Sequence, residues 1–373
     1  MNKLEEIIVR EIKAKGPLTF ARFMEMALYY PELGYYTGPR VKIGAAGDFY
    51  TSPDVHPAFG QMLARQFAEM WAKLDGPGRW ELVEYGAGKG RLAAHILNFL
   101  QEHYPETAKG LTYYILEISP SFVEIQREEL KKIKVEKIVW AKNACELSGR
   151  VTGCLFSNEL VDSFPVHRVR QTDDGLKEIY VGYRGNSFVE EEGPLSTPLL
   201  QTYFEAEGVV LEPGQAAEVN LAARDWLQEA AKCLQKGFLL TIDYGGTAAE
   251  LYAPFRPDGT LRCFYKHKLS VDPYRNIGEQ DITASINFSA LMRWGEQSGL
   301  TSLGLLSQAR FLLKLGILDL LPNSPEEYSF DHEKLKTTLA IKKLIMPGGM
   351  GEAFRVLIQC KGFPETPRLK VFQ

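Results

Sequence analysis

Residues 80–92, with the sequence WELVEYGAGKGRL, decide the fold of this chain. The first six form a short apolar run, which is typical of a buried parallel strand. Three alternating glycines follow, and from Leu92 onward apolar residues recur at helical spacing. A strand, a glycine turn and a helix place bare backbone and a helix N-terminus beside a ligand. The stretch therefore predicts a ligand-binding βα unit.

The spacing of the glycines indicates which ligand this unit binds. The dinucleotide fingerprint is G-x-G-x-x-G, but here Gly86 and Gly88 are followed by Gly90, and Arg91 stands in the third place. Glu84, at the strand end, would attract an ammonium group directly or through water. The loop leaves room for a sulfonium, so S-adenosylmethionine fits and a pyrophosphate does not. The pattern predicts S-adenosylmethionine as cofactor, and a glycine turn without a ligand is the alternative.

The next two expected strands supply further cofactor contacts. An apolar run over 112–116 ends at Glu117, where a carboxylate in a doubly wound sheet accepts hydrogen bonds from ribose hydroxyls. The alternative is a helix-capping carboxylate ahead of Ser119. After the strand expected at 138–140, the turn that holds Asn143 and Ala144 is where such folds contact an adenine ring.

Polar side chains after the fourth expected strand, 153–157, predict the acceptor site. Asn158, Glu159 and Asp162 place an amide and two carboxylates at the carboxyl end of that strand, where α/β sheets bind ligands. Two acids near a methyl donor would orient a cationic acceptor such as a guanidinium and take up its proton. Alternatively, Asp162 caps the next segment and Glu159 is a solvated charge. Among the histidines, His267 is the one candidate for a catalytic role. The alternative is that it is a structural or solvated histidine.

Composition excludes several classes of protein. The chain has 373 residues, 45% of them hydrophobic and 24% charged, as in a globular protein, and a formal net charge of −4 gives no reason to expect nucleic acid as a partner. Its five cysteines contain no C-x-x-C pair, and no histidines pair at metal spacing, so we expect neither disulfides nor a metal. We expect neither a targeting segment nor a membrane-spanning run. A cytoplasmic location without membrane insertion is therefore predicted.

The chain divides into an N-terminal region and a core. Residues 1–78 are predicted to be helical, with one helix over 20–29 capped by Thr19. The loop around Asp48 in this region is either a lid, which would bring Asp48 over the site, or a loop packed by its own aromatics. Residues 79–373 alternate strands and helices, as in a doubly wound α/β fold.

Two insertions interrupt the core. A β-meander at about 166–215 breaks the alternation and offers a surface for a homodimer or another partner. Loops and helices at about 247–345 form the second insertion.

Several motifs together resemble those of the MidA family of S-adenosylmethionine-dependent methyltransferases. The matching stretches include residues 47–53, 84–90, 117–119, 158–167, 243–245, 265–268, 281–284 and 350–354. The family includes a mitochondrial complex I assembly factor that methylates an arginine. The resemblance implies a class I methyltransferase core, a Rossmann-like sheet of seven strands, and assigns Gly86, Gly88, Gly90 and Glu117 to the cofactor. Ile118, next to Glu117, is predicted to bind it as well.

The leading hypothesis is a protein methyltransferase that favours arginine and serves respiratory complex assembly. We expect Glu159 and Asp162 to hold the acceptor, Asn158 to contact cofactor and acceptor, and Asp48 to close over them. The alternative is a non-catalytic assembly or scaffold protein that keeps the fold. A nicotinamide-dependent oxidoreductase is disfavoured by the positions of Gly90 and Arg91.

Overall fold

The computed structural model describes residues 1–38, 56–133, 137–147, 150–266, 268–321 and 332–373. The chain forms two compact units, each made of three segments. Unit 1 comprises Met1–Phe49, Val161–Trp226 and Gly245–Arg293, and unit 2 comprises Tyr50–Leu160, Leu227–Tyr244 and Trp294–Gln373. The predicted Asp48 and His267 lie outside the described residues.

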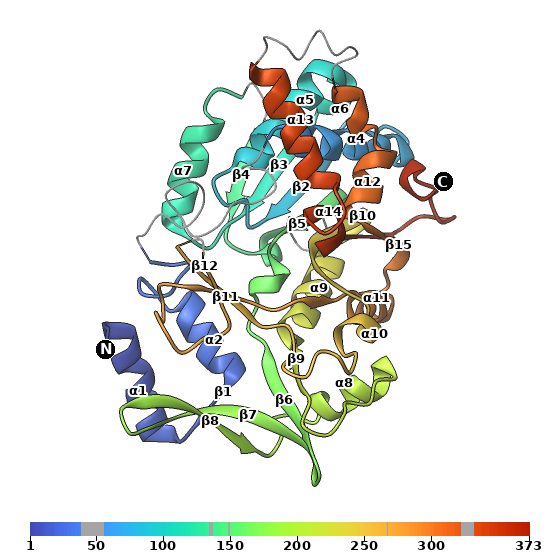
Figure 1. The fold of residues 1–373 in the computed structure, drawn as a ribbon. Coiled ribbons are helices and arrows are strands. Elements are labelled where there is room, and N and C mark those ends of the chain that lie inside the picture. The colour runs from blue at the N-terminus through green and yellow to red at the C-terminus, as the bar shows by residue number, and fades with distance from the viewer. Residues whose placement is uncertain (39–55, 134–136, 148–149, 267, 322–331) are drawn as a thin grey trace. The chain divides into compact units, whose positions relative to one another are not determined.

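Unit 2 holds the large mixed sheet, in the order β15-β16-β10-β5-β2-β3-β4 (Figure 1). The strands β4, β3, β2, β5 and β10 pair in parallel, while β16 runs antiparallel to both β10 and β15. The strands are β2 (Trp80–Tyr85), β3 (Leu111–Leu116), β4 (Lys137–Ala141), β5 (Val151–Asn158), β10 (Leu234–Gly246), β15 (Thr301–Ser307) and β16 (Phe354–Lys361). This arrangement is that of a class I methyltransferase, as the sequence predicted.

Helices cover this sheet and share its core. Buried side chains of α4, α5, α12 and α13 pack with those of the strands in one cluster, which includes Phe67, Ile96, Phe156 and Phe311. The helices are α4 (Ala58–Lys73), α5 (Arg91–His103), α6 (Pro105–Ala108), α7 (Pro120–Leu130), α12 (Gln308–Lys314), α13 (His332–Ile345) and α14 (Met350–Ala353), with short 3₁₀ turns η1 (Ala144–Leu147), η3 (Ile317–Leu320) and η5 (Lys370–Phe372). α9 (Leu221–Cys233) and α11 (Phe288–Gln297) each cross a boundary between the units.

Unit 1 contains the first helices and the meander. Its five-stranded antiparallel sheet joins β1 (Leu18–Thr19), β6 (His167–Thr172), β7 (Gly175–Arg184), β8 (Ser187–Gly193) and β9 (Ala216–Val219). A three-stranded sheet joins β11 (Arg262–Tyr265), β12 (Lys268–Ser270) and β13 (Asp281–Thr283), and β14 (Ile286–Asn287) pairs with the end of β10. The helices are α1 (Lys3–Lys15), α2 (Phe20–Tyr29), α8 (Leu199–Glu207) and α10 (Ala248–Leu251), with the 3₁₀ turn η2 (Val161–Ser163). The Thr19 side chain accepts from the N–H of Arg22 and caps α2, as predicted.

The boundary expected at residue 78 does not coincide with a boundary between the two units. The apolar face of α4 belongs to the core of unit 2, whereas residues 1–38 belong to unit 1. Gly237 lies within β10 and pairs with Gly153 of β5. A Cβ there would lie 1.9 Å from the Gly153 carbonyl oxygen, so this glycine serves strand packing. Gly349 caps the start of α14, which leads directly into β16.

No helix in the described part of the chain is both long enough and apolar enough to cross a bilayer.

Candidate functional site

The carboxyl end of β2 lies between the carboxyl ends of β3 and β5 (Figure 1). Tyr85 pairs with Leu116 on one side and with Ser157 on the other. From β2 the chain continues to β3 and β4, and then returns to β5 on the opposite side of β2. Open α/β sheets bind ligands at such a switch point. The residues that follow Tyr85, Leu116 and Ser157 therefore form the candidate site.

The glycine loop after β2 requires glycine for conformation and for space. Gly86, Gly88 and Gly90 have φ angles of 66°, 52° and 79°, a region that strains residues with a Cβ. The N–H of Gly86 donates to the Leu116 carbonyl over 3.0 Å, which anchors the loop to the end of β3. A Cβ at Gly86 would lie 2.9 Å from Cδ1 of Leu160. The three glycines therefore present backbone without side chains at the switch point.

Glu117 is held firmly at the end of β3. Its N–H donates to the Ala141 carbonyl over 3.1 Å and prolongs the sheet. Its Oε1 accepts from the N–H of Ser119 over 2.8 Å, and its Oε2 accepts from Nε2 of Gln126 over 3.0 Å. The bond from the Ser119 N–H lies at the start of α7, so Glu117 also has the helix-capping role that was the alternative prediction. A carboxylate accepts about four hydrogen bonds, so this bond orients Glu117 without excluding a ribose.

Glu84 is buried beside Tyr113. The Tyr113 hydroxyl donates to Oε2 of Glu84 over 2.7 Å. Burial and, to a smaller extent, the charge of Glu117 raise the pKa of Glu84, and the Tyr113 bond lowers it; the pKa of Glu84 is about 7 as a result. A carboxyl poised near neutrality ionises readily when a cation approaches. Its contact with the cofactor's ammonium group stays a prediction.

Asn158 and Glu159 follow one another at the end of β5. The N–H of Glu159 donates to the Ile242 carbonyl over 3.0 Å, and its φ of 52° is unusual for a residue with a side chain. Its Oε1 accepts from Nδ2 of Asn158 over 3.2 Å, and its Oε2 accepts from the Tyr244 hydroxyl over 3.5 Å. In the described part of the chain, the buried Oδ1 of Asn158 has no hydrogen-bond partner. Such outliers and unsatisfied atoms concentrate at functional sites.

Asp243 supports the segment after β5. It is fully buried, and its Oδ2 accepts from the N–H of Leu160 over 3.2 Å while its Oδ1 accepts from the N–H of Tyr244 over 2.9 Å. The carboxylate thus ties the residues after Glu159 to the end of β10. Sequence reasoning noted Asp243 within a family motif and did not predict it as a site residue.

The remaining cofactor residues of the prediction differ in exposure. Ile118 is 60% exposed beside the buried Glu117, so it offers apolar surface that a ligand would cover. Asn143 is exposed after β4, whereas Ala144 is buried and its carbonyl accepts from Sγ of Cys233 over 3.0 Å. A contact of Asn143 and Ala144 with an adenine ring stays a prediction.

Comparison with known families decides the identity of this site. A family model described as "Putative S-adenosyl-L-methionine-dependent methyltransferase" matches residues 62–306, more than half of the chain. The chain belongs to this methyltransferase family. The match spans the glycine loop, Glu117 and Asn158, and it confirms the resemblance drawn from the motifs.

Relatives agree with this assignment. The methyltransferase is 30% identical to the mitochondrial protein arginine methyltransferase NDUFAF7 of Rattus norvegicus, over 93% of this chain and 82% of the relative. The human protein of that name is 29% identical over 93% and 81%. A Burkholderia thailandensis protein solved with bound S-adenosyl-homocysteine has 33% identity and a TM-score of 0.89, over 99% of this chain and 94% of that one. S-adenosylmethionine is the cofactor of the family.

The site of the methyltransferase fits this cofactor. The glycine loop admits a ligand close to the backbone, because no Cβ lies in the way. The Oδ1 of Asn158, which has no hydrogen-bond partner among the described residues, is an acceptor that suits an ammonium group, and the Glu117 carboxylate suits hydroxyl groups. These acceptors would repel a pyrophosphate, so the chemistry of the site disfavours a nicotinamide dinucleotide.

Asp162, the other predicted acceptor residue, lies in unit 1. It is nearly buried in η2, and its carbonyl accepts from the N–H of Ala284 over 3.0 Å. The Tyr36 hydroxyl donates to Oδ1 of Asp281 over 2.8 Å. Burial raises the pKa of Tyr36 well above its usual value, and charges that include Asp281 and Asp162 add to this. Sequence reasoning did not predict Tyr36 as a site residue, and it noted Asp281 only within a family motif.

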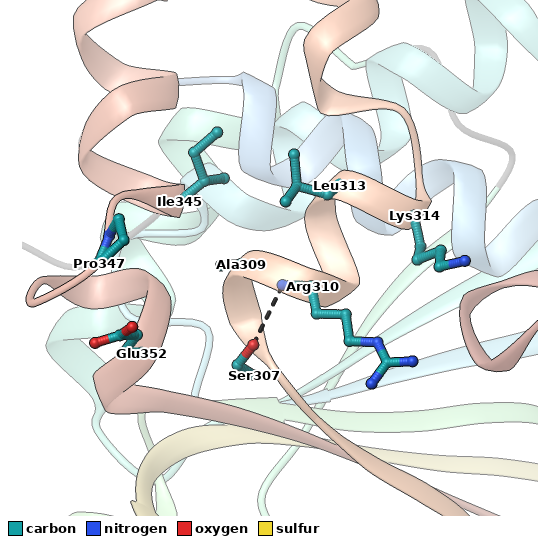
Figure 2. A pocket seen from close by; sticks show the side chains of 8 residues that line it. All are labelled: Ser307, Ala309, Arg310, Leu313, Lys314, Ile345, Pro347 and Glu352. Carbon is teal, nitrogen blue, oxygen red and sulfur yellow. Dashed lines mark hydrogen bonds between the residues drawn. The ribbon is translucent and has the colours of Figure 1, made fainter.

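A separate cavity of about 520 Å³ lies beside α12 and the segment that joins α13 to α14 (Figure 2). It is lined by Ser307, Ala309, Arg310, Leu313, Lys314, Ile345, Pro347 and Glu352. Figure 2 shows the cationic ends of Arg310 and Lys314 directed away from Ile345 and Pro347. None of the predicted site residues lines this cavity, so it is distinct from the cofactor site of the methyltransferase.

No group of three or more histidine, cysteine, aspartate or glutamate side chains among the described residues is placed to hold a metal ion.

Proposed function

We propose that this methyltransferase methylates a side chain of a protein, with arginine as the preferred acceptor. Support comes from the relatives named as protein arginine methyltransferases, which match 93% of this chain at about 30% identity. The observation that carries the proposal within this chain is the carboxylate of Glu159, held by Asn158 and Tyr244 at the end of β5.

A carboxylate at this position suits the chemistry of arginine methylation. Bound S-adenosylmethionine supplies an activated methyl group, which is transferred by in-line displacement. The guanidinium must be oriented for attack and must lose one proton as the new bond forms. A fixed carboxylate orients a guanidinium through paired hydrogen bonds and accepts that proton. We assign both tasks to Glu159, with Asp162 as a second carboxylate three residues further along the chain.

Other parts of the proposal rest on sequence motifs. Asn158 would contact both cofactor and acceptor, and Asp48 would close over them. We also propose that this methylation serves the assembly of a respiratory complex, and that it takes place in the cytoplasm. Homodimerisation through the β6–β8 meander completes the proposal.

The acceptor residue is identified by product analysis. The purified chain is incubated with S-adenosylmethionine labelled in its methyl group and with extract from cells that lack the gene, whose acceptor is unmethylated. Labelled proteins are hydrolysed, and the amino acids are separated. We expect the label in ω-N-methylated arginine, because a guanidinium is the acceptor that a fixed carboxylate serves best.

Two other outcomes would contradict the proposal. Label in methyl-lysine or in another amino acid would retain a methyltransferase and reject the arginine preference. No label from a protein that binds S-adenosylhomocysteine would favour the non-catalytic scaffold.

A further inference from the structure

Gln126 lies on α7 and connects two parts of the cofactor site. Its side chain is fully buried, although glutamine is usually exposed. Its Nε2 donates to the carbonyl of Gly88 over 2.8 Å and to Oε2 of Glu117 over 3.0 Å. Its Oε1 accepts from Nε1 of Trp140 over 3.0 Å. One amide thus joins the glycine loop, the carboxylate after β3 and the indole on β4.

The hydrogen bonds determine the orientation of this amide. Both atoms that face Nε2 are acceptors, and the atom that faces Oε1 is a donor that cannot accept. Rotation of the amide by 180° would set an oxygen against the Gly88 carbonyl and the Glu117 carboxylate. The network therefore has a single favourable arrangement, and both protons of Nε2 are engaged.

A missing side chain at Gly90 lets α7 come this close to the loop. A Cβ at Gly90 would lie 3.3 Å from both Cα and Cγ of Gln126, tighter than most Cβ contacts. Gly90 also takes the left-handed conformation that starts α5. The third glycine of the loop therefore serves the contact with Gln126 as well as the turn itself.

We propose that Gln126 is a positioning residue for the cofactor: it presets the Glu117 carboxylate for the ribose. Since the Ser119 N–H donates to the other Glu117 oxygen, both oxygens of the carboxylate are held in place before a ligand binds. Preset acceptors bind more tightly because less conformational freedom is lost on binding. The inference rests on the assignment of Glu117 to the ribose.

The test compares two buried glutamines by calorimetric titration with S-adenosylhomocysteine. Gln126→Leu removes all three hydrogen bonds and should weaken binding about tenfold, the effect of one hydrogen bond to a charged group. Gln308→Leu is the matched control. Gln308 is also fully buried in unit 2, and its Nε2 donates to the Leu344 carbonyl over 3.2 Å. The control should lose stability without losing affinity.

A ligand without ribose hydroxyls separates positioning from a general structural effect. The 2′,3′-dideoxyribose analogue of S-adenosylhomocysteine cannot donate to Glu117, so Gln126→Leu should weaken it less than about threefold. In a protein that already carries Glu117→Ala, the further substitution Gln126→Leu should weaken the binding of S-adenosylhomocysteine little more. Equal losses for both ligands would show that Gln126 does not act through Glu117 and would overturn the inference.

The remaining outcomes separate this inference from its premise. Wild-type affinity in Glu117→Ala would reject the ribose assignment itself. Weak binding in Glu117→Ala with wild-type affinity in Gln126→Leu would reject only the role of Gln126. If Gln126→Leu does not fold, the isosteric Gln126→Glu replaces it, since it keeps the volume and the Trp140 bond but loses both donated bonds. It should bind S-adenosylhomocysteine at least about tenfold more weakly, and wild-type affinity would overturn the inference.

Discussion

Replacement of Gly86 by valine should weaken the binding of S-adenosylhomocysteine at least about 100-fold. Two effects combine at this position. A φ of 66° is strained for a β-branched residue, and the Cβ would lie 2.9 Å from Leu160. Movement of the loop would relieve the strain and the close contact, but it would shift the loop backbone away from the cofactor. A 100-fold loss of affinity corresponds to about 3 kcal/mol of binding free energy.

Calorimetric titration measures this loss, and Gly185→Val is its control. Gly185 has a similar φ of 56° and lies in the turn between β7 and β8, and none of the described residues places an atom within 4 Å of its ideal Cβ. The control therefore carries the strain at a place remote in sequence from the glycine loop and should bind like the wild type. Wild-type affinity in a folded Gly86→Val protein would reject the loop as a cofactor site.

Substitution of Glu159 by glutamine should lower methyl transfer at least about 100-fold and leave the affinity for S-adenosylhomocysteine unchanged. Glutamine keeps the size of the side chain and an oxygen that accepts from Tyr244 or Asn158. It loses the negative charge that would orient a guanidinium and the basic oxygen that would take its proton. Loss of a positioned general base typically costs a factor of 10² to 10⁴.

Initial rates with the labelled methyl donor, measured on the acceptor fraction found by product analysis, test this expectation. Glu106→Gln serves as the control, because Glu106 is an exposed carboxylate on α6 of the same unit. Rates in Glu159→Gln that equal those of the control would remove Glu159 from the mechanism. A fall in cofactor affinity together with rate would instead place Glu159 at the cofactor.

Much of the sheet could be predicted because its signals are local. The strands β2, β3 and β5 are short apolar runs, and each ends at a polar residue or glycine that the chain must expose at the sheet edge. Parallel pairing then brings those ends together. For this reason Gly86, Glu117 and Asn158 were predicted from sequence alone, and the structure places them at the carboxyl ends of three neighbouring strands.

The contacts that stabilise the site could not be predicted in the same way. Gln126 stands in the polar helical stretch SFVEIQREEL, where a glutamine is normally solvated, and only the close approach of α7 to the loop buries it. Tyr36 and Asp281 are 245 positions apart in the sequence. Gly237 has the position expected of a helix stop, but its role comes from the neighbouring strand at Gly153. Each depends on tertiary contacts that no local pattern records.

The assignment of the cofactor site to the ends of β2, β3 and β5 is tested most directly at Glu117. Wild type and Glu117→Ala are titrated in parallel with S-adenosylhomocysteine, with the thermal stability of each protein recorded. Loss of two charge-assisted hydrogen bonds to ribose hydroxyls should weaken binding about 100-fold in a folded variant. Equal affinity of the two proteins would contradict the assignment and place the ribose elsewhere.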